Sequence, residues 1–139
     1  MLVVPGMPSG TPATMMTRWP ARTKPSLKAM LPAIICWTSS GSTAIRVARE
    51  RPKPPIVAIT PNLTAGRKLS VVWGVHCVVA EDAQNLDDMV SRAGRIAFRD
   101  GFVRAGQRVI IVAGVPLGIP GTTNMVRIAS VGPDGDANM

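Results

Sequence analysis

From residue 33 onward, short apolar runs alternate along the chain with segments in which apolar residues recur at helical spacing. Runs rich in Val and Ile predict strands, and a period of three to four residues predicts helices. Strands are predicted over 33–37, 56–59, 75–80, 108–113 and 124–131. Helices are predicted over about 42–50, over 61–69 and from residue 85 onward. Strands that alternate with helices are typical of an α/β fold.

The helix that begins after Asn85 has the clearest pattern. Asn85 can cap it, and Asp88 stands at the third helical position. One stripe holds the apolar residues Leu86, Met89, Val90, Ala93, Ile96 and Ala97. The other sides hold Asp87, Asp88, Arg92, Arg95 and Arg99. Because Asp88 and Arg92 form an i, i+4 pair, these charges are interpreted as a solvent-exposed face.

The run 108–113 consists almost entirely of Val and Ile after its arginine, which is typical of a strand buried on both faces of a parallel sheet. No helix is predicted between this run and the last strand, 124–131. A parallel crossover is therefore disfavoured, and the last strand should run antiparallel at the sheet edge. The sequence predicts a mostly parallel sheet of five strands with the last one antiparallel.

Residues 1–32 differ in character from the rest. This segment has six prolines and no followable period, so it is predicted to be loop or disordered. Its first thirty residues carry four basic residues and no acid, a composition that overlaps with organelle transit peptides, although the prolines oppose the amphipathic helix of such peptides. The chain is divided into residues 1–32 and one α/β domain over 33–139.

Composition narrows the function classes. A chain of 139 residues with 46% apolar content fits one domain with a real core. The net charge of +8 favours anionic partners, but three Trp, two Phe and no Tyr offer little for base stacking, so nucleic-acid binding is disfavoured. No apolar run approaches the roughly 20 residues of a membrane span. No membrane association is predicted.

The cysteines and the histidine give no sign of catalytic or metal chemistry. Cys36 and Cys77 lie in apolar runs, where free cysteines behave as small buried hydrophobes, and they suggest a reducing cytoplasm. His76 precedes Cys77 on a predicted strand, so the two side chains should point to opposite faces. With one histidine, a four-ligand zinc site or a histidine-based catalytic triad is not expected.

The turn after the first strand is the first candidate site. A strand, a hydroxyl-rich turn and a helix start bring free N–H groups and a positive dipole end together, which favours an anion such as phosphate. Alternatively, Ser40, Ser42 or Thr43 merely caps the helix. A Walker-type loop is excluded because no lysine follows Gly41. The candidate residues are Thr38, Ser39, Ser40, Gly41, Ser42 and Thr43.

The second candidate site is the loop before the last strand, which is too rich in Gly and Pro for regular structure. Ligands in open α/β sheets gather at the carboxyl ends of strands, and both this loop and the first turn leave such ends. The two segments are therefore expected to face one ligand. The loop residues are Gly114, Val115, Pro116, Leu117, Gly118, Ile119, Pro120, Gly121, Thr122 and Thr123.

Four separated blocks of sequence carry a family resemblance. They are Cys-Trp-Thr-Ser-Ser-Gly-Ser-Thr-Ala, Arg-Pro-Lys-Pro-Pro-Ile-Val-Ala-Ile-Thr-Pro-Asn, Leu-Ser-Val-Val-Trp-Gly-Val and Gly-Val-Pro-Leu-Gly-Ile-Pro-Gly-Thr-Thr-Asn-Met. In this order they closely resemble the C-terminal domain of bacterial pyruvate kinases. The resemblance covers residues 33 to about 135, and the first thirty residues depart from it. A truncated or misread frame fused to a domain fragment is therefore suspected.

The resemblance implies a three-layer domain with helices on both faces of a five-stranded sheet. In the family, an allosteric effector, a phosphorylated sugar or nucleotide, sits between two segments that match 38–43 and 114–123 here. Relatives that bind a sugar bisphosphate usually have a basic residue in the first turn, whereas this turn has none, so a monophosphate is expected. The edge strand, 124–131, is expected to join subunits in a homo-oligomer.

The resemblance also limits what this chain should do alone. The catalytic residues of pyruvate kinases, and the Mg and K ions they use, belong to barrel and lid domains that this sequence does not contain. A regulatory domain of glycolysis without catalytic activity is therefore expected, and the alternative is a stand-alone binding domain for a small phosphorylated metabolite. Without the family's preceding helices, one face of the sheet should expose apolar surface.

Overall fold

A computed structural model describes residues 32–117, 119 and 121–138 of the chain. The predictions made for residues 1–31 lie outside this part. The strands are β1 (Ile34–Trp37), β2 (Ile56–Thr60), β3 (Val75–Val79), β4 (Arg108–Ala113), β5 (Met125–Val131) and β6 (Ala137–Asn138). The helices are α2 (Ser42–Arg49), α3 (Leu63–Leu69) and α4 (Leu86–Arg99). Each predicted element from residue 33 onward is present, with bounds that differ by a few residues at most.

All strands join one sheet in the order β3-β2-β1-β4-β5-β6. The first four run parallel, and β5 pairs antiparallel with β4, as the missing crossover helix predicted. The sheet has a sixth strand that the sequence did not predict, because two residues are too few to show a period. β6 pairs with Ser130 and Val131, so β5 is an edge strand only over residues 125–129.

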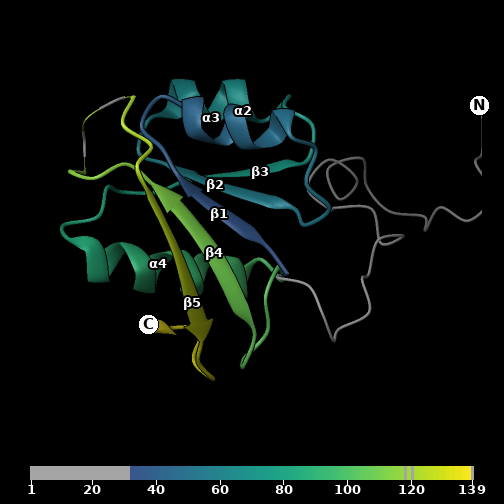
Figure 1. Cartoon of the computed structure of the whole chain (residues 1–139), viewed down its shortest axis with the longest axis vertical. Coiled ribbons are helices and arrows are strands. Elements are labelled where there is room, and N and C mark those ends of the chain that lie inside the picture. The colour runs from purple at the N-terminus through teal and green to yellow at the C-terminus, as the bar shows by residue number, and fades with distance from the viewer. Residues whose placement is uncertain (1–31, 118, 120, 139) are drawn as a thin grey trace, which may run out of the picture.

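Helices cover both faces of the sheet, with α2 and α3 on one side and α4 on the other (Figure 1). Alternate residues of β1 serve the two cores: Ile35 and Trp37 pack on the α4 side, and Cys36 packs on the α2 side. A strand buried on both faces must be apolar throughout, which explains its sequence. Full burial of a side chain such as Ile35 contributes about 1.5–3 kcal/mol to stability.

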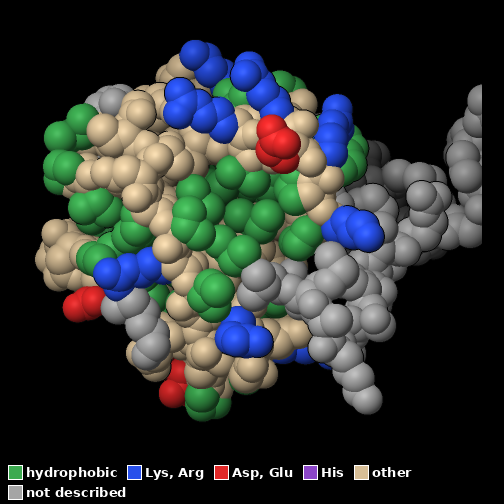
Figure 2. All heavy atoms as spheres, viewed as in Figure 1, with side chains coloured by type: hydrophobic (Ala, Val, Ile, Leu, Met, Phe, Trp, Pro, Cys, Tyr) green, Lys and Arg blue, Asp and Glu red, His purple; other side chains and the backbone are tan. Residues whose placement is uncertain are grey.

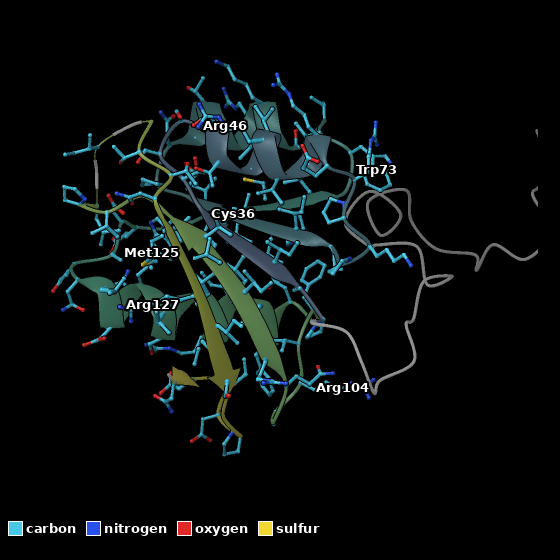
Figure 3. The ribbon with its side chains drawn as sticks, in the orientation of Figure 1. Cys36, Arg46, Trp73, Arg104, Met125 and Arg127 are labelled. Atoms are coloured by element: carbon cyan, nitrogen blue, oxygen red, sulfur yellow. The ribbon has the colours of Figure 1, made fainter. Side chains whose placement is uncertain are left out.

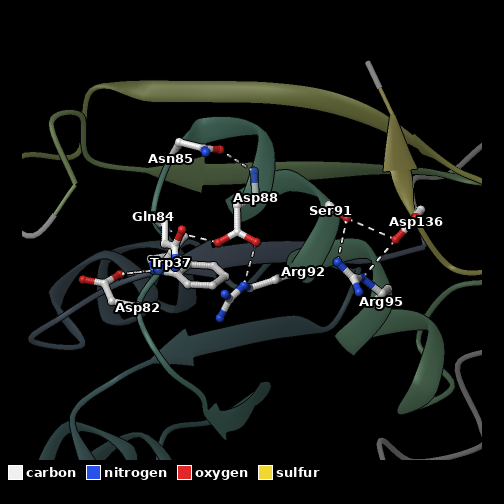
Figure 4. A network of polar contacts seen from close by, with 10 residues as sticks. Trp37, Asp82, Gln84, Asn85, Asp88, Ser91, Arg92, Arg95 and Asp136 are labelled. Carbon is white, nitrogen blue, oxygen red and sulfur yellow. Dashed lines mark hydrogen bonds and ion pairs between the residues drawn. The ribbon is translucent and has the colours of Figure 1, made fainter.

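The start of α4 has the predicted cap. Asn85 Oδ1 accepts a hydrogen bond from the N–H of Asp88 at 2.8 Å, and Asp88 accepts one from the N–H of Gln84 at 3.1 Å (Figure 4). The predicted ion pair is also present, with Arg92 Nε 2.8 Å from Asp88 Oδ1. The hydrogen bond from Arg92 lowers the pKa of Asp88. None of the helices in the described ranges is long and apolar enough to cross a membrane.

The segment before β6 is bound to α4 by a hydrogen bond and an ion pair to Asp136. Ser91 Oγ donates to Asp136 Oδ1 at 3.1 Å, and Arg95 Nε lies 2.9 Å from the same oxygen (Figure 4). Gly94 lies between these two residues, where a Cβ atom would come within 2.5 Å of the Cβ of Ala137. The absence of a side chain at Gly94 therefore lets β6 approach the helix closely.

Among the described residues, no helix covers the part of the sheet formed by β4 and β5 on the side of α2. Val126 and Ile128 of β5 are 68% and 57% exposed. Hydrophobic side chains gather over the middle of the face seen in Figure 2. The expectation of exposed apolar surface on one face of the sheet is confirmed.

The contact at Gly94 yields a stability prediction. Alanine favours a helix over glycine by about 1 kcal/mol, but here its Cβ would meet backbone atoms of residues 135 and 137 at 2.8 Å. Gly94→Ala should therefore lower the free energy of unfolding by about 1–2 kcal/mol, as overpacking does. Urea denaturation followed by circular dichroism measures the change.

The matched control is Gly66→Ala in α3, where the added Cβ would meet at 2.8 Å only a methyl group of Val79, which can rotate. This variant should lose less stability than Gly94→Ala. Equal stabilisation by both substitutions would show that β6 does not pack against α4 as described.

Candidate anion-binding site

The candidate site lies at the carboxyl ends of β1 and β4. These strands are parallel neighbours, with Cys36 beside Val112 in the register. From β1 the chain passes to α2 on one face, whereas β4 is reached from α4 on the other face, so this is the point where the strand order reverses. Open α/β sheets bind ligands at such a point. The turn 38–41 and the loop 114–123 both leave from it, as predicted.

The turn after β1 is shaped by Thr38 and Gly41. The N–H of Gly41 donates to Thr38 Oγ1 at 2.9 Å, and the Thr38 side chain is buried. Gly41 has a φ of 87°, a conformation that favours glycine, and an added Cβ would lie 3.3 Å from Leu69 Cγ. Gly41 therefore sets the direction in which the chain enters α2.

The start of α2 retains free donors. Its N-cap residue is Gly41, which has no side chain, but Ser40 Oγ accepts the N–H of Ser42, the first helical residue, at 3.4 Å. The alternative of a capping role is therefore met in part by Ser40 and not by Ser42 or Thr43. The hydroxyls of Ser40 and Ser42 lie 3.1 Å apart. The N–H groups of Thr43 and Ala44 have no acceptor among the described residues. Such free N–H groups at a helix start favour an anion.

The loop before β5 is held by Asn124. Its amide accepts from the N–H of Val115 and donates to the carbonyl of the same residue, both at 2.7 Å. At Gly114 an added Cβ would overlap the carbonyl oxygen of Thr122. Only glycine allows the two ends of the loop to come this close.

The turn and the loop meet. Thr43 Oγ1 and Thr123 Oγ1 are 2.8 Å apart, and beside them lies a small pocket that is open to solvent. The pocket is lined by Trp37, Thr38, Ser39, Ser40, Ser42, Thr43, Gly114, Leu117, Ile119, Gly121 and Thr122. The two predicted segments therefore line the same pocket.

Not every predicted residue lines the pocket. Gly41, Val115, Pro116 and Thr123 lie outside the lining. Gly118 and Pro120 lie outside the described residues. The lining residue that sequence reasoning missed is Trp37, whose position at the end of β1 was the available signal. Its Nε1 donates to Asp82 Oδ1 at 3.0 Å (Figure 4).

Among the residues that the structure describes, no charged side chain lines the pocket. Its donors are hydroxyls and backbone N–H groups, and the positive end of the α2 dipole points toward it. Arg46 lies on the exposed surface of α2 and not in the lining (Figure 3). A site of this kind can hold the anionic group of a ligand by neutral donors alone.

The cysteines and the histidine take no part in the pocket. Both cysteines are free, and burial raises the pKa of Cys36 to about 12 and also raises that of Cys77. His76 turns toward the opposite side of the strand, where its Nε2 lies 3.0 Å from Asp100 Oδ2. No group of three or more His, Cys, Asp or Glu side chains that could hold a metal ion occurs in the described part.

Comparison with known proteins identifies the domain. Residues 23–129 match the family described as "Pyruvate kinase, alpha/beta domain", a match that begins inside the basic N-terminal segment. The chain is 54% identical over 101 residues to a pyruvate kinase of Methylorubrum extorquens, 40% over 99 residues to one of Clostridium acetobutylicum, and 46% over 99 residues to one of Lactobacillus delbrueckii subsp. bulgaricus.

These alignments cover 73%, 71% and 71% of this chain but only 21%, 21% and 17% of the relatives. The chain thus spans about a fifth of the length of the curated pyruvate kinases it matches. The resemblance found in the four sequence blocks is confirmed, and so is the fold class. On the match over residues 23–129, this chain belongs to the pyruvate kinase alpha/beta domain family.

Proposed function

We propose that this chain is the regulatory, effector-binding domain of a pyruvate kinase of glycolysis. The observation that carries the proposal is the pocket between the turn 38–43 and the loop 114–123, which is lined by hydroxyl side chains and by Thr43 with its free N–H group. A site with free donors and no charged lining suits the phosphate of a small effector. The domain works in the cytoplasm.

The proposed ligand is a phosphate monoester of a sugar or a nucleotide. Each neutral hydrogen bond contributes on the order of 1 kcal/mol net, and one to a charged phosphate about twice that. Several such bonds support roughly micromolar to millimolar dissociation constants. A second phosphate would call for a cationic partner that the lining lacks. A monophosphate is therefore favoured over a bisphosphate.

Catalysis belongs, in this proposal, to the other four-fifths of a pyruvate kinase, together with the metal ions that the reaction requires.

Assembly is proposed to use the open part of β5. Residues 125–129 have no strand on their outer side within the described part of the chain, and an open edge can pair with another chain. A second copy of this domain is the proposed partner.

The first prediction from this proposed function is that negative charge placed in the pocket prevents phosphate binding. The double variant Ser40→Asp, Ser42→Asp should abolish phosphate binding, because two carboxylates would stand beside the free N–H groups of α2. The fold should persist, since Asp in the first turn of a helix suits the dipole. Isothermal titration calorimetry with glucose 6-phosphate, ribose 5-phosphate and AMP measures the affinity.

The control variant is Thr64→Asp, which adds a carboxylate in the first turn of α3 at an exposed position outside the lining. It should bind as the parent does. The variant Ser40→Ala, Ser42→Ala separates lost hydroxyls from added charge and should weaken binding without abolishing it. Equal affinity of the parent and the Asp double variant would refute the pocket as the phosphate site.

The second prediction of this function concerns Asn124, whose amide holds the loop 114–123 through two hydrogen bonds to Val115. Asn124→Ala removes both hydrogen bonds to Val115, so the loop should become less ordered and effector affinity should fall by about tenfold. Because Asn124 is exposed, the midpoint of urea unfolding should change little. The same titrations measure the affinity, and an unchanged dissociation constant would show that the loop does not contribute to binding.

A further inference from the structure

Two loops lie side by side at the amino ends of β2 and β3, at the edge of the sheet opposite the candidate anion site. The loop 50–55 leads from α2 into β2, and the loop 70–74 leads from α3 into β3. Ile56 and Val75, which follow the two loops, are partners in the register. The N–H of Ile56 donates to the carbonyl of Gly74 at 3.0 Å, so the ends of the loops are in direct contact.

A cation–π contact joins the two loops. The guanidinium carbon of Arg51 lies 4.5 Å from the centroid of the Trp73 ring. Arg51 has a φ of 48°, a left-handed conformation that a residue with a side chain rarely adopts, and Pro52, Pro54 and Pro55 restrict the rest of its loop. Residues in such conformations are frequent at ligand-binding positions. The backbone and the indole together hold the guanidinium in one place.

Positive charge gathers around this pair. Residues 42–74 carry six Lys and Arg and a single acid, Glu50, whereas residues 75–138 carry six Arg and seven acids. The four ion pairs found among the described residues all lie in the second group. Figure 2 shows Lys and Arg on the upper side of the molecule, which α2 and α3 form in Figure 1, with one acid among them. The six basic residues of the first group are all exposed: Arg46, Arg49, Arg51, Lys53, Arg67 and Lys68.

Helix stabilisation explains only part of this charge. Basic residues in the last turns of α2 and α3 suit the negative ends of the helix dipoles. Arg51 and Lys53, however, lie beyond the end of α2, where they add positive charge to a region that already has an excess of it. An anionic partner would balance this charge.

The chemistry of the partner follows from the side chains beside Arg51. A guanidinium that stacks on a ring keeps the N–H donors at its edge, in the planar arrangement that matches a carboxylate. Val71 and Trp73, which are 85% and 52% exposed, offer apolar contacts next to it. Stacking of nucleobases needs open aromatic faces, and Arg51 already covers one face of the indole. These features favour a polypeptide over a nucleic acid.

We propose that the surface formed by Arg51, Lys53, Val71 and Trp73, which we call the Arg51–Trp73 surface, binds an acidic segment of another polypeptide. Arg51 holds one carboxylate by two N–H donors, and Lys53 attracts a second. Val71 and the exposed part of Trp73 contact an apolar side chain of the same segment. Residues 1–31 of this chain are a poor match for this surface, because they carry four basic residues and no acid.

The test uses the full chain and two labelled peptides of 12 residues. One has leucine at every fourth position and glutamate elsewhere, and the other has glutamine in place of glutamate. Fluorescence anisotropy measures binding. The glutamate peptide should bind saturably, and the glutamine peptide at least about tenfold more weakly, because charged acceptors bind a guanidinium more strongly than neutral ones do. Added salt should weaken binding of the glutamate peptide by screening the charges.

Arg51→Gly is the central variant. Glycine accepts the left-handed backbone of this position, so the fold should persist, and the glutamate peptide should bind about tenfold or more weakly. Arg51→Lys keeps the charge but loses the planar set of donors, and its affinity should lie between those of the parent and Arg51→Gly. Trp73→Ala removes the ring that holds the guanidinium and should weaken binding by at least about threefold.

The matched control is Arg104→Ala. It removes an exposed arginine that lies away from Trp73 in Figure 3, and this variant should bind the glutamate peptide nearly as the parent does. Circular dichroism confirms that each variant is folded.

Four outcomes would overturn the proposal. The first is equal binding of both peptides, or equal weakening by Arg51→Gly and Arg104→Ala. The second is absence of saturable binding to a parent that sedimentation shows to be a monomer. The third is binding of a labelled oligouridine that is tighter than that of the glutamate peptide and is lost in Arg51→Gly, which would assign the surface to nucleic acid. The fourth is a parent dimer that Arg51→Gly converts to a monomer, which would assign the surface to a second copy.

Discussion

The central position of β1 is the constraint on which the rest of this domain depends. β1 lies between β2 and β4 and faces α2 on one side and α4 on the other, so both sets of its side chains must be apolar. Its polar neighbours can begin only where the strand ends, at Thr38. The hydroxyl-rich turn therefore stands at the reversal point of the sheet because the strand before it must be fully buried.

The second half of the site follows from β4, which must also be buried and cannot carry polar side chains over most of its length. The loop after β4 turns back toward the end of β1. Gly114 allows the close approach of Thr122, and the hydrogen bond from Asn124 to Val115 holds the loop together. Two strands that are neighbours only in space thus bring together segments from distant parts of the sequence. The proposed anion site would need no charged side chain, because backbone N–H groups and hydroxyls are already concentrated there.

Most of the fold could be predicted from periodicity, because long amphipathic or apolar segments leave a clear signal, as in α4 with its Asn85 cap and Asp88–Arg92 pair. β6 could not be predicted, since its place depends on the missing side chain of Gly94 and on the bonds of Asp136. The five turn residues that line the pocket could be predicted from their hydroxyls. The role of Trp37 could not, because its indole both packs in the core and reaches the pocket.

The contact between Thr43 and Thr123 joins residues 80 positions apart. A ligand in the pocket would touch both segments at once, and in the unfolded chain they do not form a site. Binding there is therefore linked to folding of the entire sheet: a ligand at a hundred times its dissociation constant adds about 2.7 kcal/mol to the stability of the native state. The concentration of a small anionic ligand would in this way shift the equilibrium between the folded and the unfolded domain.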